Sequence, residues 1–414
     1  MSSGDANVSR RGVLGAGLGI GAAGLLAGCS TGSSKDAARA TAGAKSSTPG
    51  ASPTTSARTV KTIGDGSMSD TGPQPKQPKF SALKAGQKPP QFVVISWDGA
   101  GETKSKLNSH FQQVAAELGA SMTLFTTGIY LLPESKKSLY RPPQHRVGAS
   151  DIGYFPDSAI HSTIEQTGKA WLAGHEIGTH FNGHFCGPTG GSRWSVGDWK
   201  SEIEQAVSFF ANWRTNTGFT DLPSLPFDYR KELTGGRTPC LEGFDNLRKA
   251  AADLGWRYDT SNARYPMWPL KVPGTKVWDI SMQTVPMPGL RNGVLSMDYN
   301  YMANQSTVTN GPAAKRPGWR QQMVTSLIAG FDRSFNGNRS PLVIGNHFEH
   351  WNGGIYMEAV EEVMRTLAKR PDTKLVSFRQ LCDWMDAQTP AVTKRLQQLP
   401  GAPQGGWDEY LQLT

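Results

Sequence analysis

Three histidines and a cysteine stand close together near the middle of the chain. His175, His180, His184 and Cys186 all lie in the stretch WLAGHEIGTHFNGHFC. Imidazole is a common ligand of divalent metal ions, and two imidazoles four residues apart, as in His180 and His184, can converge on one ion. Such a pair needs a third donor, usually a carboxylate or another nitrogen, from elsewhere in the chain. The residues alone leave open whether this is a metal site or a set of ordinary surface or core histidines.

Other side chains that can do chemistry follow apolar, strand-like runs. Asp98 comes shortly after the run FVVIS, and His347 ends the run LVIGNH. Arg237 lies in the loop segment GGRTPC. Active residues of barrel enzymes gather at the C-terminal ends of parallel strands. The shared position therefore predicts that Asp98, His180, Arg237 and His347 belong to one site.

The elements that would position these residues follow a βαβ order. Residues 92–96 are apolar and β-branched, which is typical of a buried strand. Residues 104–118 have apolar side chains at helical spacing and end at Gly119, and residues 121–126 form the next strand. This order predicts an α/β fold with a parallel sheet or barrel. We expect further helices from about residue 195 to 213 and over residues 245–254, 320–331, 356–370 and 379–385, and we interpret residues 131–163 as an insertion.

The segment GHEIGTHFNGH resembles the second motif of the NodB-homology polysaccharide deacetylases, which are metal-dependent N- and O-deacetylases. In that family H-[ST]-x-x-H supplies two metal ligands, which His180 and His184 match, with Phe181 in place of Ser or Thr. His175 matches a histidine that does not bind the metal, so we interpret it as structural. The resemblance covers residue 91 to about residue 385 and implies a distorted (β/α) barrel.

The first motif of that family, T-F-D-D-G, is divergent because only one aspartate remains in Ser96-Trp97-Asp98-Gly99-Ala100. In one alignment Asp98 stands at the position of the catalytic base and Gly99 at that of the metal ligand. In the other, Asp98 is the ligand and Trp97 stands at the base position. We favour Asp98 as a ligand, because two histidines alone hold a divalent ion poorly and an oxygen donor completes the set.

The remaining motifs differ in how well they are preserved. Arg237-Thr238-Pro239 matches the R-x-P motif, whose arginine fixes nearby carboxylates. His347 matches the strand-terminal histidine that acts as general acid. Glu102 and Glu349 are alternative candidates for the base, although a solvated loop position is the simpler interpretation of both. The fourth motif is poorly preserved, with Asp259, Trp268, Trp278 and Asp279 as candidates.

The resemblance implies a metal-dependent hydrolase that removes acetyl groups from cell-wall or environmental polysaccharide by amide, or ester, cleavage. Its divalent ion, expected to be zinc, would be held by Asp98, His180 and His184, and the catalytic residues would be His347, Arg237 and Asp98. Loss of a general base costs on the order of 10²–10⁴ in rate. The missing aspartate thus supports a second hypothesis, a non-catalytic glycan-binding protein on the same fold. A third is an amidase that acts on non-sugar C–N bonds.

Three of the four cysteines lie in the predicted domain. Cys186 follows His184 by two residues and Cys240 follows Arg237 by three, so both are expected at the rim of the site. Outside the cytoplasm we expect a disulfide between them, which would hold two active-site segments together. A rival hypothesis makes Cys186 a metal ligand. Cys382, in an apolar helical segment, is predicted to be a buried thiol.

Residues 1–29 have the pattern of an export signal. A twin-arginine pair in SRRGVLG precedes an apolar run that is shorter than the roughly 20 residues of a bilayer span. The run ends in LAGC, which resembles a bacterial lipobox and implies cleavage before Cys29 and lipidation of its sulfur. We therefore expect an exported protein, anchored by lipid to the outer face of the cell membrane.

Composition divides the rest of the chain. Residues 30–90 consist mainly of Ser, Thr, Ala, Gly, Pro and Lys and are predicted to be a flexible linker. Residues 91–389 form the predicted domain, and residues 390–414 a polar C-terminal tail. The net charge of +9 fits an anionic cell-wall partner. Nucleic acid is not expected as a partner, because the sequence has no Lys/Arg-rich run and no zinc-finger spacing.

Overall fold

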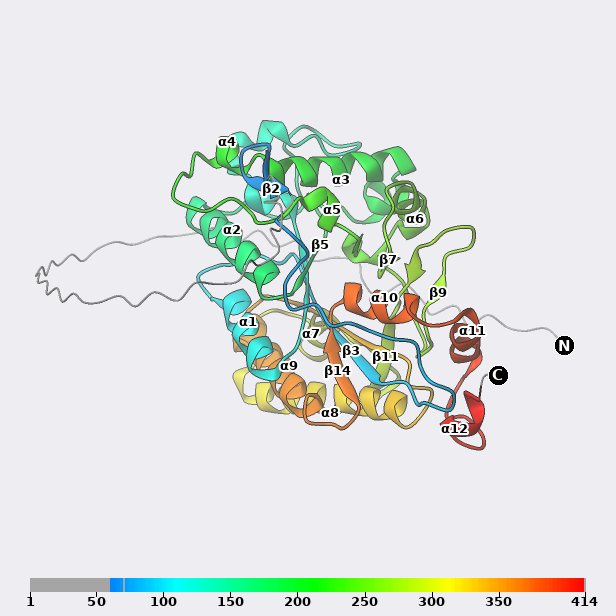
Figure 1. Ribbon diagram of the computed structural model, residues 1–414. Helices are drawn as coiled ribbons and strands as arrows, with labels where there is room; N and C mark the ends of the chain where they lie inside the picture. Colours follow the sequence, from blue (N-terminus) through cyan, green and yellow to red (C-terminus); the bar gives the residue numbers. More distant parts are fainter. Residues whose placement is uncertain (1–59, 70, 413–414) are drawn as a thin grey trace, which may run out of the picture. The chain divides into compact units, whose positions relative to one another are not determined.

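A curled, mostly parallel sheet forms the centre of the computed structural model, which describes residues 60–69 and 71–412 (Figure 1). Its strands follow the order β13-β3-β4-β5-β6-β7-β10-β9, and β14 also pairs with β3. The pairs are parallel except β10 with β9. The strands are β3 (Gln91–Asp98), β4 (Thr123–Thr126), β5 (Glu176–Thr179), β6 (Gly235–Gly236), β7 (Tyr258–Asp259), β9 (Leu270–Lys271), β10 (Trp278–Asp279), β13 (Leu342–His347) and β14 (Thr373–Val376). The predicted α/β class and barrel-like sheet are confirmed.

Strand β3 is an inner strand, between β13 and β4. Its sequence, QFVVISWD, is suited to burial on both faces, and all of its residues are buried. Strand β13 pairs along β3, while β14 pairs with its first half and β4 with its second half. The register places His347 directly opposite Asp98. A second pairing, Thr179 with Gly236, brings the residues that follow β5 and β6 side by side.

Helices cover the sheet, and those predicted from the sequence are present within a few residues of the expected limits (Figure 1). Ser195 caps the helix that begins at Val196, in a reciprocal hydrogen-bonding arrangement with Asp198, and Gly119 ends the first helix in a left-handed conformation. The helices that match predictions are α1 (Leu107–Leu118), α3 (Val196–Ala211), α6 (Phe244–Asp253), α8 (Arg316–Phe335), α9 (Ile355–Leu367) and α10 (Phe378–Asp386).

Several elements were not predicted. The presumed insertion at residues 131–163 contains the start of α2 (Asp157–Leu172), whose buried face includes Ile160, Ile164 and Trp171. A hairpin of β11 (Met282–Met287) and β12 (Leu290–Leu295) precedes α7 (Asp298–Gln305), and β8 (Ala263–Arg264) pairs with β11. Short helices α4 (Trp213–Thr217) and α5 (Tyr229–Glu232) follow α3.

The predicted linker over residues 30–90 is wrong for the part that the structure describes. Strands β1 (Lys61–Ile63) and β2 (Ser67–Ser69) pair with each other, and β2 lies near α4 (Figure 1). The carbonyl of Gly66 accepts a hydrogen bond from the indole of Trp213 at 2.6 Å. Gln74 is also anchored, since its amide donates to two backbone carbonyls near α2. Polar composition concealed this order because the stabilising partners lie far away in the sequence.

The predicted C-terminal tail is likewise part of the folded unit. Helix α11 (Pro390–Gln398) buries Val392 and Leu396, and Leu411 after α12 (Trp407–Tyr410) is fully buried. These side chains belong to the same apolar cluster as Phe92 of β3. A few apolar residues spaced among polar ones therefore anchor the segment to the domain.

Residues 1–59, which include the predicted export signal, Cys29 and the first half of the predicted linker, lie outside the described residues. Within the part of the chain that is described, no helix has both the length and the apolar character needed to cross a bilayer.

Candidate functional site

A buried ion pair joins the ends of two strands at the predicted site. Asp98 ends β3, Arg237 follows β6, and the guanidinium Nη1 donates to Asp98 Oδ1 at 2.7 Å. Arg237 Nη1 also donates to Ser96 Oγ, and its Nε donates to the carbonyl of Thr260. The guanidinium lies over the ring of Phe125 at 5.0 Å. The arginine is therefore held on several sides, and it contacts a carboxylate, that of Asp98, as the R-x-P resemblance implied.

The charge of Arg237 determines the ionisation of Asp98. Burial favours the neutral carboxyl, but the positive charge of Arg237 and its hydrogen bond outweigh burial and hold the pKa of Asp98 below its usual value. Asp98 is therefore a carboxylate at neutral pH, with a fixed orientation toward the arginine.

His180 and His184 lie in the loop that follows β5. His180 Nδ1 donates to the carbonyl of Arg237 at 2.8 Å, which leaves Nε2 as the unprotonated nitrogen of the neutral ring. The loop turns sharply, with left-handed backbone conformations at Phe181 and His184, and the two imidazole centroids are 5.1 Å apart. Burial lowers the pKa of both histidines, that of His184 to about 3. Two neutral imidazoles, one with its second nitrogen bound to a carbonyl, are suited to a divalent ion.

The third donor is less well matched to the prediction. Asp98 Oδ1 accepts a hydrogen bond from Arg237. This contact suits a base that an arginine orients, whereas a metal ligand does not need it. Among the described residues, one group of three potential metal-ligand atoms lies within 4.8 Å of one another. It consists of His184, Cys186 and Cys240, and it does not include Asp98. The residues present thus fit an ion held by the histidine pair, with Asp98 nearer to the role of base.

His347 has a partner that the sequence did not reveal. Its Nδ1 and the Oδ1 of Asp298 are 2.8 Å apart, and its backbone N–H donates to Asp298 Oδ2 at 2.7 Å. Asp298 is fully buried, and the side chain of His347 is 23% exposed. Burial lowers the pKa of His347, but the negative charge of Asp298 and the hydrogen bond outweigh it and raise the pKa to about 9. His347 is therefore an imidazolium at neutral pH.

A signal for Asp298 was present in the sequence. It follows the run GVLSM, so it has the same position after an apolar run as Asp98. Residue Met297 forms a parallel bridge with Gly345 of β13, which carries Asp298 to the end of that strand.

These groups line one cavity of about 160 Å³. Asp98, His180, His184 and His347 all contribute to its walls, so four of the predicted site residues meet there. Four aromatic residues contribute to its other walls: Tyr130 and Phe155, whose rings stack at 3.7 Å, and Phe348 and Trp351. Arg237 lies behind Asp98 and does not reach the cavity surface.

The other candidates have different positions. Glu349 lines the cavity, and burial raises its pKa. Glu102 is fully buried, and its carboxylate accepts from the backbone N–H of Ser109, so the expectation of a solvated loop position is wrong for it. Asp259 and Asp279 both pair with Arg248, outside the cavity lining. Trp268 and Trp278 lie in an apolar core cluster.

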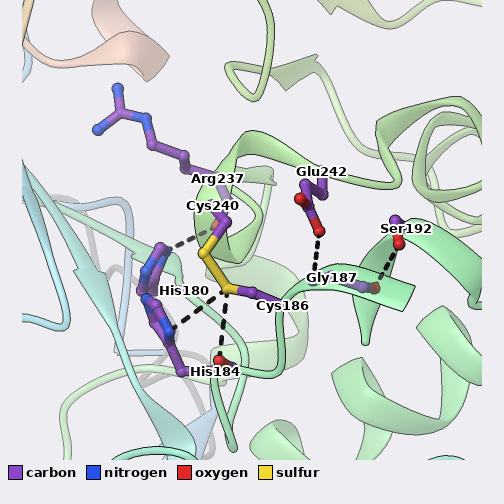
Figure 2. The surroundings of a disulfide bond; sticks show 8 residues. All are labelled: His180, His184, Cys186, Gly187, Ser192, Arg237, Cys240 and Glu242. Carbon is purple, nitrogen blue, oxygen red and sulfur yellow. Dashed lines mark hydrogen bonds between the residues drawn. A yellow bond between two sulfur atoms is a disulfide. The ribbon is translucent and has the colours of Figure 1, made fainter. Parts of the chain in front are cut away.

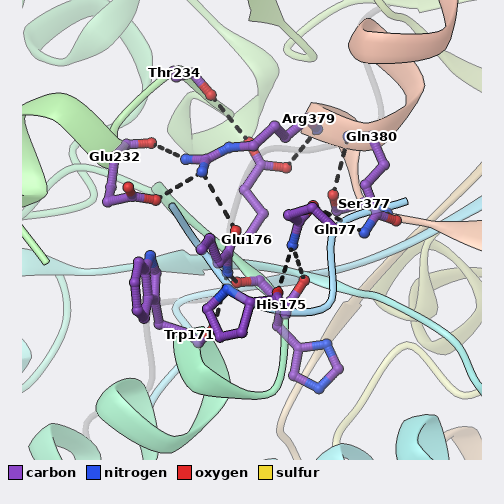
Figure 3. A network of polar contacts seen from close by, with 12 residues as sticks. Gln77, Trp171, His175, Glu176, Glu232, Thr234, Ser377, Arg379 and Gln380 are labelled. Atoms are coloured by element: carbon purple, nitrogen blue, oxygen red, sulfur yellow. Dashed lines mark hydrogen bonds and ion pairs between the residues drawn. The ribbon is translucent and has the colours of Figure 1, made fainter. Parts of the chain in front are cut away.

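His175 and Glu176, at the start of β5, belong to a structural network (Figure 3). His175 Nδ1 accepts from the backbone N–H of Met122, and burial lowers the pKa of His175 to about 4. The Glu176 carboxylate accepts from Tyr258 and from the backbone N–H of Arg379. These contacts tie β5 to its neighbours at the end opposite the cavity, in agreement with the structural interpretation of His175.

The expected disulfide between Cys186 and Cys240 is present, with a Cα–Cα distance of 6.0 Å (Figure 2). It joins the loop of the histidine pair to the loop that follows Arg237. Cys382 is a buried free thiol, as predicted.

Comparisons with known proteins give structural likeness only. No family model and no curated protein matches the sequence. Among solved structures, a Mycobacterium smegmatis protein classed as a polysaccharide deacetylase has 12% identity and a TM-score of 0.45, covering 76% of this chain and 97% of its own. A family 4 carbohydrate esterase from Streptomyces lividans has 14% identity, a TM-score of 0.36 and coverages of 69% and 91%. A peptidoglycan deacetylase from Bacillus subtilis has 12% identity, a TM-score of 0.37 and coverages of 72% and 92%. At this level of likeness the function must be argued from the residues of the chain itself.

We expect Asp298→Asn to lower the pKa of His347 from about 9 toward its ordinary value near 6.5, because burial is then opposed only by the weaker effects of Asp98 and Glu349. In the native protein the folded-state pKa lies above the unfolded one. This pair therefore contributes stability fully below about pH 6.5, and that contribution is lost as pH rises through about 9. Titration of the imidazole C–H resonances by NMR measures the pKa directly.

The matched control is Asp221→Asn, which removes the carboxylate of a surface Asp–His pair with His161. This variant should leave the titration of His347 unchanged. An unaltered His347 pKa in Asp298→Asn would contradict the assignment of Asp298 as the group that keeps His347 protonated.

Proposed function

We propose that this protein is a hydrolase that removes acetyl groups from the amide, or ester, positions of a polysaccharide. One observation carries the proposal: a single aromatic-walled cavity contains an ionised carboxylate, Asp98, and a protonated imidazole, His347, on adjacent strands. Titratable groups whose environments shift their pKa values in opposite directions mark the base and the acid of a reaction. Both are needed to hydrolyse an acetamide.

Asp98 and His347 have opposite roles in the proposed reaction. Asp98 accepts a proton from the attacking water, and Arg237 holds its carboxylate in one orientation. His347 is the acid: Asp298 engages Nδ1, so Nε2–H is the group that protonates the leaving nitrogen. The water oxygen forms the new bond to the acyl carbon, the C–N bond breaks, and acetate and an amine are released.

His180 and His184 would hold the divalent ion, for which zinc is the proposed identity. When bound, such an ion polarises an acyl carbonyl and lowers the pKa of water near it. The neutral state of both imidazoles and the carbonyl contact of His180 Nδ1 support this role.

Acetylated glycan is the proposed substrate because aromatic side chains form much of the cavity wall. Flat faces such as those of Tyr130 and Trp351 suit the apolar faces of sugar rings. The cavity is small, so it would admit the acetylated group and not a whole chain. The rest of the polymer, a cell-wall or environmental polysaccharide, would stay outside the cavity mouth.

A second candidate function is glycan binding without hydrolysis. It is favoured by Gly99, which stands directly after Asp98 where the resemblance placed a second carboxylate. The histidine pair then lacks an oxygen donor from β3, and an ion held by two imidazoles is held weakly.

We expect the purified protein to release acetate from acetylated chitooligosaccharide or acetylated xylan. His347→Ala should reduce the rate of release by about 10²–10⁴, which is the usual contribution of an acid–base residue. The rate should also fall as pH rises through about 9, because His347 then loses the proton that it donates. Enzymatic acetate assay over a pH series measures both effects.

The control is His350→Ala, a histidine three residues away that does not line the cavity. Sugar binding by the native protein with no acetate release from any of these substrates would favour the binding function instead.

We expect Gly99→Asp to increase the amount of zinc that the protein retains after dialysis. A Cβ at this position would meet the nearest side-chain atoms, of Tyr130 and Thr127, at 3.7–3.9 Å, which is ordinary van der Waals contact. The backbone φ of +62° is left-handed, a conformation that aspartate tolerates better than most residues. Metal analysis of the dialysed protein gives the readout.

Gly99→Asn is the matched variant, since it has the same backbone strain and nearly the same size but no charge. Equal zinc in Gly99→Asp and Gly99→Asn would show that the carboxylate does not reach an ion at the histidine pair.

We also propose that the protein is exported and anchored to the outer face of the membrane by a lipid on Cys29. The support is the LAGC segment after an apolar run with a twin-arginine pair. Cys29→Ser should abolish labelling by a radioactive fatty acid and shift the protein from the membrane fraction to the soluble fraction. Equal labelling of native protein and variant would contradict the anchor.

A further inference from the structure

The disulfide lies against the histidine pair, and its sulfurs are close to an imidazole. His184 Nδ1 is 3.9 Å from the Sγ of Cys186 (Figure 2). The donor atoms of His184, Cys186 and Cys240 all lie within 4.8 Å of one another. His184 and Cys186 are both partly exposed, so small molecules can reach the group. Two sulfurs and an imidazole at these distances are the donors of a thiolate metal site.

The two cysteines would stay close together without the S–S bond. On one side of the disulfide, His180 Nδ1 donates to the carbonyl of Arg237 at 2.8 Å. On the other side, the backbone N–H of Gly187 donates to the carboxylate of Glu242 at 2.7 Å (Figure 2). These two contacts join the same pair of loops that the disulfide joins. Reduction would therefore leave a dithiol whose sulfurs are already positioned.

We propose that Cys186, Cys240 and His184 form a second metal-binding site when the disulfide is reduced, one that takes thiophilic divalent ions such as zinc. A dithiol reductant supplies two electrons and two protons, the S–S bond becomes two thiols, and the reductant becomes a disulfide. The incoming ion then displaces both thiol protons, and the imidazole of His184 completes a Cys₂His donor set.

This site shares His184 with the histidine pair, so an ion bound by the thiolates withdraws one imidazole from the acetyl-hydrolase site. The redox state of Cys186 and Cys240 thus decides whether His184 binds metal together with His180 or together with the two thiolates. The metal-binding inference itself does not depend on the proposed hydrolysis, because it concerns sulfur donors that the hydrolytic reaction does not use.

Cobalt is a suitable probe, because Co²⁺ bound to thiolate gives a charge-transfer absorption in the near ultraviolet that imidazole ligands alone do not give. Full-length protein carrying Cys29→Ser is reduced with a phosphine, separated from the reductant without oxygen, and titrated with CoCl₂. We expect the thiolate band to appear in the reduced protein, to be absent from the oxidised protein, and to be lost when excess zinc replaces the cobalt.

Three matched variants identify the ligands. Cys186→Ser/Cys240→Ser should lose the band entirely, and His184→Ala should lose most of it at the same cobalt concentration. Cys382→Ala should keep it, since that thiol is buried in another part of the fold. Circular dichroism of each variant confirms that it is folded.

No thiolate band in the reduced protein would overturn the proposal, as would a band that survives in the double serine variant or is unchanged in His184→Ala. His347→Ala separates the two proposals, because it removes the acid of the proposed hydrolysis and should leave the thiolate band. Absence of acetate release together with a normal band would contradict only the hydrolase function.

Discussion

The buried pair of Asp98 and Arg237 is the contact on which the rest of the site depends. Two opposite charges, with only the edge of Asp98 reaching the cavity, are held at 2.7 Å between the ends of β3 and β6. Breaking such a pair costs about 3–5 kcal/mol, because it leaves a charge buried without a partner, whereas the intact pair adds little net stability. The pair therefore fixes geometry more than it stabilises the fold. Any shift of β3 relative to β6 would separate these charges.

Burial is common to the ionisable groups of the cavity, yet it leads to three different charge states. Asp98 stays negative because the positive charge of Arg237 outweighs the effect of burial on its pKa. His347 stays positive because the negative charge of Asp298 outweighs the effect of burial on its pKa. At His180 and His184 burial outweighs the attraction of the Asp98 charge, so both imidazoles stay neutral. The nearest charge, and not the residue type, determines what each group can do in a reaction. A proton acceptor, a proton donor and two uncharged ligands can thus share one small space.

The sequence predicted β3 and β13 well because they are short apolar runs suited to burial, and their ends located Asp98 and His347. It also predicted the disulfide, since both cysteines follow site residues closely. It did not settle the role of Asp98, which depends on the distance to Arg237, 139 residues away. Asp298 was missed although it follows an apolar run, because its contact with His347 joins residues 49 positions apart in the chain. The order of residues 60–69 and 71–90 was hidden for a similar reason: polar side chains such as that of Ser67 are fixed by distant partners.

One short segment after β6 connects all parts of the site. The side chain of Arg237 binds Asp98, and its carbonyl binds His180. Three residues later, Cys240 forms the disulfide with Cys186 in the loop of His184. The backbone of Cys240 is left-handed. The Asp98 carboxylate, the imidazole pair and the disulfide are therefore all attached to the same short backbone segment. Because β5 and β6 pair at only Thr179 and Gly236, these side-chain and carbonyl contacts, and not an extended strand ladder, keep the two loops in register.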